Sequence, residues 1–500
     1  MSDILEIKGE SGTLYKYYDE IIGAGGMKDV YFTTDKQYAI GFYRDKSDAV
    51  MKERLKMLTG RYRDRIYNQQ GGEYWNDLFC WPEDIVTNGD GFLGVVVPVY
   101  HSHFFFEYGS FNNDILKIKG KEKEGKWYSS PTNRYRFLNK KERGDWLSYL
   151  RISILIARSV KRLHAAGLAH SDLSYKNVLV DPVGGNACII DIDGLVVPGK
   201  FPPDVIGTPD FIAPEVITTQ HLSMDDKGRK LPSIHTDRYA LAVLIYMYLL
   251  LRHPLKGNKV HDVNNSDEDE KLSMGSKAIF VEHEQDLSNR PDLNDIKDEE
   301  IRWLDTNKLS YKTTGPYLSK LIKRAFEDGL HDPGKRPSAD EWETALVKTV
   351  DLIQPCQNSS CDQKWFVFDN TTVPCCPFCG TDYSAQLPVL NLYSSRKAGS
   401  FKPDNHRLMV YSGQSLYPWH VNRLVFPNER MSTTQKKRVC YFLYHNDKWL
   451  LVNENMSDLT EVSSKKAIAI GESVELKDGA QILFSKENGG RLAQVQLVGE

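Results

Sequence analysis

Residues His170 to Asp181 read HSDLSYKNVLVD, and a second acidic cluster, IIDIDG, follows at 189–194. Three oxygen-bearing side chains, Asp172, Asn177 and Asp191, lie within twenty residues, on two short loops flanked by strand-like apolar runs. Oxygen ligands of this kind hold magnesium, and a carboxylate beside them orients a hydroxyl group against a nucleotide phosphate. A surface turn rich in Asp and Asn would contain the same residue types, so landmarks elsewhere in the chain must decide.

The bulk composition is that of an ordinary globular protein. The chain has 500 residues, 41% hydrophobic and 26% charged, with a net charge of −3. This length predicts about two to four domains, and the charge argues against nucleic acid or an anionic membrane as the main partner. The longest apolar run, Tyr239–Leu251, is too short to span a bilayer and predicts a buried helix. The N-terminus, MSDILEIKGE, lacks the features of a signal peptide, so we expect a cytoplasmic location.

The two acidic loops resemble motifs of the protein kinases, the catalytic loop H-R-D-L-x-x-x-N and the metal-binding D-F-G. The resemblance implies that Asp172 is the catalytic base and that Asn177 and Asp191 bind magnesium. Asp193 stands where D-F-G has glycine and offers a second carboxylate to the nucleotide site. Ser171 replaces the arginine of H-R-D, and residues 194–207 contain no Ser, Thr or Tyr. We therefore expect an activity that is not controlled by phosphorylation of the activation loop.

Landmarks further along the chain favour a protein kinase over a kinase of small molecules. The segment GTPDFIAPE, Gly207–Glu215, nearly matches the one that builds the peptide-substrate platform. Asp237 resembles the helix-F aspartate, and Arg336 resembles the arginine that pairs with the glutamate of A-P-E, here Glu215. We expect an α+β, bilobal kinase fold over residues 12–352, with an N-lobe at about 12–100 and a C-lobe at about 101–352.

The predicted phosphate-binding hairpin lies upstream, in EIIGAGGMKDVYFTTDKQYAIGFYR (20–44). Gly23, Gly25 and Val30 match three positions of the kinase motif G-x-G-x-x-G-x-V, and Gly26 belongs to the same glycine cluster. The runs VYF and YAIGFY predict two strands after this cluster.

The nucleotide lysine is displaced in this hairpin. Lys28 stands at the third glycine position, and Gly41 stands where V-A-I-K has its lysine. The exchange is similar to that in the with-no-lysine kinases, which implies that Lys28 supplies the positive charge. Apolar spacing predicts a helix at Ser47–Arg63, and the resemblance makes its Glu53 the partner of Lys28. The alternatives are an exposed turn lysine and a solvated helix glutamate.

Three further segments of the kinase region carry structural predictions. Gly109–Lys141 is polar and basic and predicts a solvated insertion. Asp145–Ala166 predicts a long helix that ends at Gly167. Lys256–Asn294 contains HDVNNSDEDEK and predicts a disordered loop, with a docking site as the alternative.

Five of the eight cysteines fall between Cys356 and Cys379. The pairs Cys356-x4-Cys361 and Cys376-x2-Cys379 predict a structural zinc site in a ribbon of residues 353–385, because four thiolates satisfy tetrahedral zinc without an open position. Cys375 is a fifth candidate that could replace Cys376. Free thiols are the alternative.

The last part of the chain, residues 386–500, has the pattern of a β-sandwich. Strands are predicted at LVFPNE, VCYFLYHN, KWLLVNE, KAIAIG, SVELKDGAQILFS and RLAQVQLVG. The segment from Trp449 to Ser457 and the strands after it resemble a forkhead-associated (FHA) domain, which implies phosphopeptide binding. The S-x-x-H signature of those domains is not visible, and Arg423 or Ser432 are the candidates in its place. A docking or autoregulatory sandwich is the alternative.

The order of kinase, zinc ribbon and FHA-like sandwich resembles bacterial kinases of the tellurite-resistance group, which are associated with a PP2C-type phosphatase and a von Willebrand A protein. The resemblance implies a cytoplasmic, ATP- and Mg²⁺-dependent serine/threonine kinase that acts on protein substrates. A pseudokinase scaffold that binds nucleotide and recruits partners is the second hypothesis. The missing lysine at Gly41 favours the scaffold, whereas the presence of Asp172, Asn177 and Asp191 favours the enzyme.

Overall fold

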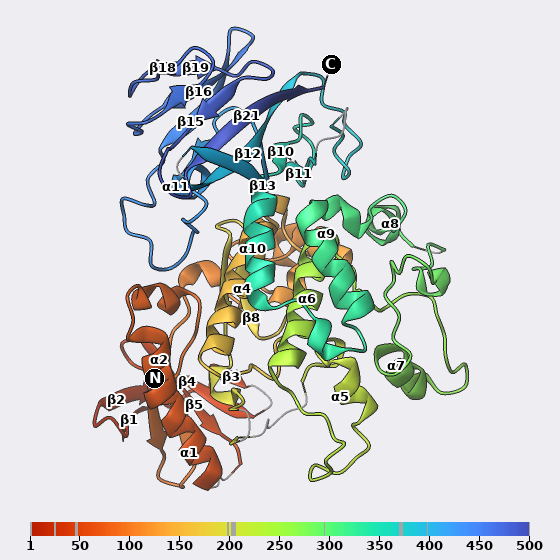
Figure 1. Ribbon diagram of the computed structural model, residues 1–500. Coiled ribbons are helices and arrows are strands. Elements are labelled where there is room, and N and C mark those ends of the chain that lie inside the picture. The colour runs from red at the N-terminus through yellow and green to blue at the C-terminus, as the bar shows by residue number, and fades with distance from the viewer. Residues whose placement is uncertain are drawn as a thin grey trace. The chain divides into compact units, whose positions relative to one another are not determined.

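The computed structural model describes residues 3–24, 27–45, 49–197, 200–201, 207–294, 296–369, 374–397 and 399–499. The chain forms two compact units, and Figure 1 labels many of their elements. Unit 1 comprises Met1–Gly144, Ser148–Asn307 and Leu321–Glu343, and unit 2 comprises Asp145–Leu147, Lys308–Lys320 and Thr344–Glu500.

An antiparallel sheet of five strands forms the N-terminal part of unit 1, in the order β3-β4-β5-β7-β6. Its strands are β3 (Gly23–Ala24), β4 (Lys28–Phe32), β5 (Tyr38–Tyr43), β6 (Asp84–Thr87) and β7 (Leu93–Pro98), and a hairpin of β1 (Ile4–Lys8) and β2 (Leu14–Tyr18) precedes them. The run YAIGFY forms the central strand β5, whose side chains are nearly all buried, as its apolar character requires. The two strands predicted from VYF and YAIGFY are confirmed.

The helix predicted at Ser47–Arg63 is present from Ala49 and runs further than expected, whereas its predicted start at Ser47 lies outside the described residues. α1 (Ala49–Met57) continues through a π-helical turn (Leu58–Tyr62) into α2 (Arg63–Tyr67). Leu55 of α1 is fully buried and packs with residues of the sheet, including Tyr43 and Val95. The helix is thereby fixed on one face of the sheet.

Two long helices organise the C-terminal part of unit 1. α4 (Trp146–Ala165) ends before Gly167, whose φ of 80° is the left-handed conformation expected at a helix terminus. α6 (Ile234–Leu250) is buried almost all round, which confirms the helix predicted from the apolar run 239–251. The other helices of the chain are α3 (Phe111–Asp114), α5 (Pro214–Thr218), α7 (Ser266–Met274), α8 (Asp298–Leu304), α9 (Gly315–Lys323), α10 (Ala339–Val350) and α11 (Pro418–Val421).

The segment Gly109–Lys141, predicted to be a solvated insertion, is instead packed into unit 1. Tyr128 and Leu138 are completely buried, and Arg134 donates to the carbonyl oxygens of Tyr128 and Tyr248. The charges that suggested solvation have partners, since Lys123 lies 3.0 Å from the carboxylate of Glu142. A basic composition cannot distinguish such paired charges from solvated ones.

The acidic run expected to be disordered forms a helix. α7 starts at Ser266, and the side chain of Asn265 accepts a hydrogen bond from Glu268 N–H at 3.2 Å. Asp267, Glu268 and Asp269 occupy the first turn, where negative charge is favourable. The charges therefore mark a helix N-terminus rather than disorder.

Unit 2 is rich in β-structure, as predicted. A hairpin of β10 (Ile353–Pro355) and β11 (Trp365–Val367) precedes two antiparallel sheets, with the orders β13-β12-β21-β20-β17-β18 and β14-β15-β16-β19. Their strands are β12 (Leu387–Lys397), β13 (Ser400–Met409), β14 (Ser415–Leu416), β15 (Cys440–His445), β16 (Lys448–Asn453), β17 (Thr460–Glu461), β18 (Lys466–Ala467), β19 (Ser473–Glu475), β20 (Gln481–Leu483) and β21 (Arg491–Val498).

One of the strands predicted for unit 2 is wrong. LVFPNE (424–429) is not a strand, because Asn422 turns the chain: its side chain accepts from Leu424 N–H at 2.9 Å and its carbonyl from Val425 N–H at 3.2 Å. The long pair β12 and β13 supplies the edge of the larger sheet. Among the described helices, none has both the length and the apolar character needed to cross a lipid bilayer.

Candidate active site

The buried carboxylate of Asp237 in α6 fixes the start of the loop His170–Asn177. Ser233 caps this helix, which places Asp237 in its first turn. The Asp237 carboxylate accepts from His170 N–H at 2.7 Å and Ser171 N–H at 3.2 Å. Ser171 has a φ of 68°, a backbone conformation that is unfavourable for most residues other than glycine and asparagine. The hydrogen bonds to Asp237 stabilise this conformation. Asp237 thus has the position expected for a helix-F aspartate.

Asp172 is oriented by two donors from different segments. Its Oδ1 accepts from Thr208 N–H at 2.6 Å, and its Oδ2 accepts from Asn177 Nδ2 at 2.9 Å. Asn177 Nδ2 also donates to the carbonyl of Asp172 at 2.8 Å. Since its nitrogen is engaged in this way, Asn177 keeps its side-chain oxygen Oδ1 as a possible metal ligand. Sequence reasoning did not identify the contact of Asp172 with Thr208, which belongs to the GTPDFIAPE segment.

A short hairpin brings Asn177 and Asp191 together. The strands β8 (Val178–Asp181) and β9 (Asn186–Ile189) pair in register, and Ile190 N–H donates to the carbonyl of Asn177 at 3.0 Å. Asp191 follows at the open end of this hairpin with a φ of 60° and a side chain that is 46% exposed. An amide oxygen and an accessible carboxylate at one hairpin end are hard donors that fit Mg²⁺.

Lys28 reaches these acidic residues from the N-terminal sheet. Its Nζ lies 3.1 Å from Asp191 Oδ1 and 2.9 and 2.7 Å from the two oxygens of Asp193. The lysine side chain is 21% exposed and that of Asp193 is 6% exposed. Burial alone would lower the pKa of Lys28, but the negative charges of Asp193 and Asp191 outweigh it and raise this pKa. Lys28 is therefore a cation at the centre of the acidic cluster.

Gly41 leaves the space through which the side chain of Lys28 passes. On the paired strands, Val30 faces Gly41 and Lys28 faces Tyr43. A Cβ atom at position 41 would lie 3.5 Å from Cδ and 3.9 Å from Cβ of Lys28. The methylene groups of Lys28 therefore lie over the position where V-A-I-K carries its own lysine.

Tyr43 completes the surroundings of Lys28. Its hydroxyl group donates to Asp193 Oδ2, and the Lys28 ammonium lies 5.4 Å from the centre of the tyrosine ring. Burial and the charge of Asp193 raise the pKa of Tyr43 well above its usual value. Burial would raise the pKa of Asp193, but Lys28 and the Tyr43 hydroxyl lower it. Asp193 is thus an ionised carboxylate whose closest contacts are these two groups.

The predicted pair of Lys28 with Glu53 is wrong. Glu53 is 58% exposed on α1 and accepts from Lys200 Nζ at 2.8 Å. The physical reason is that Asp193 and Asp191 already satisfy the ammonium group of Lys28. Of the predicted glycine-rich loop, Gly23 pairs with Val30 in a hairpin, whereas Gly25 and Gly26 lie outside the described residues.

The segment Gly207–Glu215 is anchored by an ion pair at its end. Arg336 donates to both carboxylate oxygens of Glu215, at 2.8 and 2.7 Å, and its own side chain is fully buried. This is the predicted partnership of the two residues. A bidentate, charge-assisted pair of this kind fixes the end of the GTPDFIAPE segment in one orientation.

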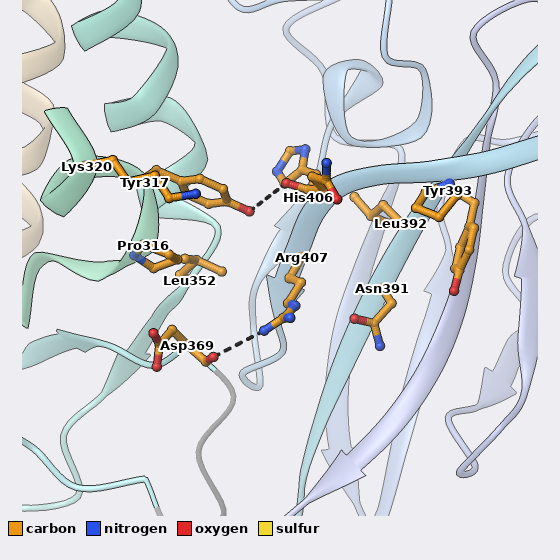
Figure 2. A pocket seen from close by; sticks show the side chains of 12 residues that line it. Pro316, Tyr317, Lys320, Leu352, Asp369, Asn391, Leu392, Tyr393, His406 and Arg407 are labelled. Atoms are coloured by element: carbon orange, nitrogen blue, oxygen red, sulfur yellow. Dashed lines mark hydrogen bonds between the residues drawn. The ribbon is translucent and has the colours of Figure 1, made fainter. Parts of the chain in front are cut away.

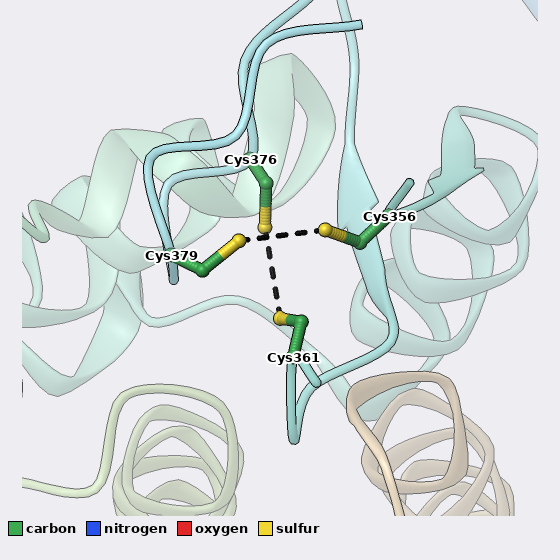
Figure 3. Close-up of side chains that lie close together, drawn as sticks. All are labelled: Cys356, Cys361, Cys376 and Cys379. Atoms are coloured by element: carbon green, nitrogen blue, oxygen red, sulfur yellow. Dashed lines mark hydrogen bonds between the residues drawn. The ribbon is translucent and has the colours of Figure 1, made fainter. Parts of the chain in front are cut away.

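Four cysteines converge in unit 2 (Figure 3). Cys356 and Cys361 lie in the connection between β10 and β11, and Cys376 and Cys379 lie on a tight turn closed by Gly380, whose φ is 74°. All four sulfur atoms lie within 4.8 Å of one another. Zn–S bonds of about 2.3 Å require sulfur atoms about 3.8 Å apart in a tetrahedron, so this donor set fits zinc. Cys375 is exposed and is not a member of the cluster.

A cavity of about 650 Å³ also lies within unit 2 (Figure 2). Its walls come from α9, β12 and β13, and include Tyr317, Asn391 and Arg407. Arg407 donates to the carbonyl of Asp369 at 3.2 Å, and Tyr317 donates to that of Asn405 at 3.1 Å. Both polar side chains are thus partly satisfied by the protein itself. The phosphopeptide candidate Arg423 lies elsewhere in unit 2, 3.6 Å from the carboxylate of Asp404, and Ser432 is exposed.

Comparisons with known proteins find similarity mainly over the segment that contains Asp172, Asn177 and Asp191. Residues 142–345 match the family described as the protein kinase domain. The chain is 24% identical over 261 residues to a "cAMP-dependent protein kinase, catalytic subunit-like" protein of Caenorhabditis briggsae, covering 46% of this chain and 63% of that relative. It is 29% identical over 145 residues to the serine/threonine-protein kinase PknD of Chlamydia abortus, covering 24% of this chain and 14% of the relative.

Among solved structures, the rhoptry antigen kinase domain of Toxoplasma gondii aligns with a TM-score of 0.40 and 12% identity, over 70% of this chain and 86% of that chain. The chain spans less than two thirds of the length of the two curated relatives. The match to this family is confined to residues 142–345, and one of these two relatives is named a serine/threonine-protein kinase. The matched residues include Asp172, Asn177 and Asp191 but not Lys28.

Proposed function

We propose that unit 1 transfers the γ-phosphate of ATP to serine or threonine hydroxyl groups of a protein substrate. The main observation behind the proposal is that four side chains with complementary roles lie close together. They are the base Asp172, the oxygen donors Asn177 and Asp191, and the cation Lys28. Phosphoryl transfer requires little else, because its catalysis is mainly positioning and electrostatic stabilisation. Asp172 would accept the proton of the substrate hydroxyl group, since its carboxylate is held in one orientation by Thr208 and Asn177.

Asn177 Oδ1 and the Asp191 carboxylate would hold Mg²⁺, which neutralises the charge that develops on the phosphate oxygens. Lys28 would contact the same phosphates by exchanging its 3.1 Å contact with Asp191 for a phosphate oxygen. A cation that is already in position stabilises the negative charge of the transition state, and the site does not have to rearrange during the reaction.

We also propose that this activity needs no phosphate on the activation segment. Ser171 cannot bind a phosphate as the arginine of H-R-D does, and its backbone is already held by Asp237. Thr208 N–H, which follows this segment, donates directly to Asp172, and this supports an orientation of Asp172 that needs no modified residue.

For unit 2 we propose a structural zinc ion in a ribbon of residues 353–385, supported by the converging sulfur atoms. We infer that residues 386–500 form an FHA-like module that binds a phosphopeptide or docks a protein, supported by the two antiparallel sheets. The family resemblance further suggests a bacterial, cytoplasmic protein whose partners are a PP2C-type phosphatase and a von Willebrand A protein.

The test is incubation of the pure protein with γ-labelled ATP, Mg²⁺ and a generic acceptor such as casein. Label on phosphoserine and phosphothreonine, absent with Asp172→Ala, is the expected result. Equal labelling by wild type and Asp172→Ala would assign the activity to a contaminant. Wild-type protein that binds Mg–nucleotide but transfers no label would instead support the pseudokinase scaffold, which the glycine at position 41 favours.

A further inference from the structure

Two departures from the kinase motifs meet in space. One is Lys28 on β4, and the other is Asp193 in the loop Asp191–Gly194, called the metal loop below because it contains the proposed magnesium ligand Asp191. We propose that Asp193, rather than Glu53, is the positioning residue that holds Lys28 for the nucleotide phosphates. The inference rests on the proposed function, because it assigns a role within that reaction. It also reassigns Asp193, which the sequence suggested as a second carboxylate for nucleotide or metal.

Several contacts hold the carboxylate of Asp193 against the ammonium group of Lys28. Both carboxylate oxygens lie within hydrogen-bond distance of Lys28 Nζ, at 2.9 and 2.7 Å. The Tyr43 hydroxyl group donates to Oδ2 of the same carboxylate, which fixes its orientation. A nearly buried carboxylate with two donors from neighbouring strands has few alternatives to this position.

The backbone of the metal loop holds Asp193 in place. Asp193 is the middle residue of a short 3₁₀ turn, Ile192–Gly194, directly after Asp191. Ile192 and Leu195 on either side are buried. The loop that presents the proposed metal ligand Asp191 therefore also presents the partner of Lys28, and the two carboxylates are fixed relative to each other.

Gly41 explains why the carboxylate is needed at position 193. Because Lys28 starts from β4 and passes over Gly41, its ammonium group arrives beside the metal loop. A glycine at position 193, as in D-F-G, would leave Lys28 with Asp191 alone. Mg²⁺ would then compete with Lys28 for its only carboxylate.

Glu53 lacks the features of a positioning residue. It and its partner Lys200 are 58% and 48% exposed, and exposed ion pairs contribute little. Since Lys28 is held by the metal loop, its position does not depend on the placement of α1. The inference therefore predicts a site whose lysine is in place whatever the position of that helix.

A double-mutant cycle distinguishes this inference from the alternative that Asp193 binds metal. It compares the wild type with Lys28→Met, Asp193→Asn and the double variant. The readouts are kcat and KM for ATP, the Mg²⁺ concentration for half-maximal rate, and the Kd of a fluorescent ATP analogue with Mg²⁺. If Asp193 acts through Lys28, Asp193→Asn alone weakens kcat/KM by about tenfold or more, yet has less than about a threefold further effect in the Lys28→Met background. In the Lys28→Met background, where no ammonium group competes for Asp191, Asp193→Asn should not change the Mg²⁺ requirement.

Glu53→Gln is the matched control and should stay within about twofold of wild type. Tyr43→Phe, a milder change at the same carboxylate, should show a smaller loss of the same kind and keeps the test usable if Asp193→Asn folds poorly. Losses that multiply in the Lys28→Met background, a raised Mg²⁺ requirement in that same background, or an equally severe Glu53→Gln would overturn the inference. An inert wild type would instead refute the proposed function, and the cycle on analogue binding would still decide the role of Asp193.

Discussion

Lys28 and Gly41 are complementary residues on neighbouring strands. The stem of Lys28 lies over Gly41, where an added Cβ would be in ordinary contact at 3.5 Å, but a longer side chain would meet the lysine. Single-residue changes at position 41 therefore test the placement of Lys28 without touching its charge.

We predict that Gly41→Leu raises the KM for ATP at least about tenfold, because the new side chain displaces the methylene groups of Lys28. Gly41→Ala should remain within about twofold of wild type, since its Cβ fits. Steady-state kinetics, with thermal melting to verify folding, would check both. Unchanged kinetics in folded Gly41→Leu would show that Lys28 does not depend on this space.

Asp191 and Asp193 should differ in their dependence on Mg²⁺. Asp191 is accessible and adjoins Asn177, whereas Asp193 is nearly buried against Lys28. We predict that Asp191→Ala abolishes the Mg²⁺-dependent part of nucleotide binding more completely than Asp193→Ala, as measured by titration with and without Mg²⁺. Equal losses would mean that both carboxylates hold metal.

At the scale of elements, the segment Gly207–Glu215 contacts a buried histidine. His253 Nε2 donates to the carbonyl of Asp210 at 2.9 Å, and its Nδ1 accepts from Leu255 N–H at 3.1 Å. The neutral ring therefore satisfies both neighbours. Burial lowers the pKa of His253 from 6.5 to about 4.

This histidine should make unit 1 less stable in mild acid. Between about pH 6.5 and pH 4 the unfolded chain binds a proton at His253 that the folded chain does not, so the free energy of unfolding falls as the pH falls. The slope contributed by one group is at most about 1.4 kcal/mol per pH unit. Urea unfolding at several pH values should show a smaller pH dependence for His253→Gln than for wild type. Identical slopes for the two proteins would contradict the assignment.

Much of the element order was predictable from the sequence, and the failures have physical causes. The strands of VYF and YAIGFY and the apolar helix α6 follow from local patterns that tertiary contacts reinforce. The segment Gly109–Lys141 and the helix α7 were missed, because charged side chains can be paired, buried or capping, and composition alone does not distinguish these roles.

The linear motifs indicated three acidic or amide residues that the structure brings close together, but they did not give the partner of Lys28. The positions of Asp172, Asn177 and Asp191 follow from linear motifs, because one loop and one hairpin hold them. The partner of Lys28 depends on which way a long side chain runs across a sheet, and this cannot be read from spacing. The D-x-D pattern was a visible signal for Asp193, but its pairing with a lysine 165 positions away was not.

At the scale of the whole molecule, the two units carry different chemistry. Unit 1 contains the proposed phosphate-transfer residues, and unit 2 contains the cysteine cluster and the two sheets. A zinc ion bound by four thiolates would contribute directly to the stability of its own module. Loss of the zinc ion should therefore destabilise unit 2 before it affects unit 1.

We predict about one zinc per chain by elemental analysis. Cys379→Ser should lose the metal and unfold the 353–385 module while the catalytic loop region stays folded, which limited proteolysis would detect. Cys375→Ser is the matched control and should keep the metal, because Cys375 is exposed and outside the cluster. Metal-free wild-type protein with four titratable thiols in this segment would refute the zinc site.

The central claim is that Lys28 supplies the cation for phosphoryl transfer, and the most direct measurement compares label transfer from ATP by Lys28→Met, Lys36→Met and Lys16→Met. A lost charge-assisted contact costs about 1.5–3 kcal/mol in binding, and more where transition-state charge is stabilised. Lys28→Met should therefore be at least about a hundredfold slower than wild type. The controls should be nearly unaffected, since Lys36 is an exposed turn residue and Lys16 pairs with Glu6 on the surface. The claim would be contradicted if Lys36→Met or Lys16→Met lost label transfer from ATP while Lys28→Met kept it.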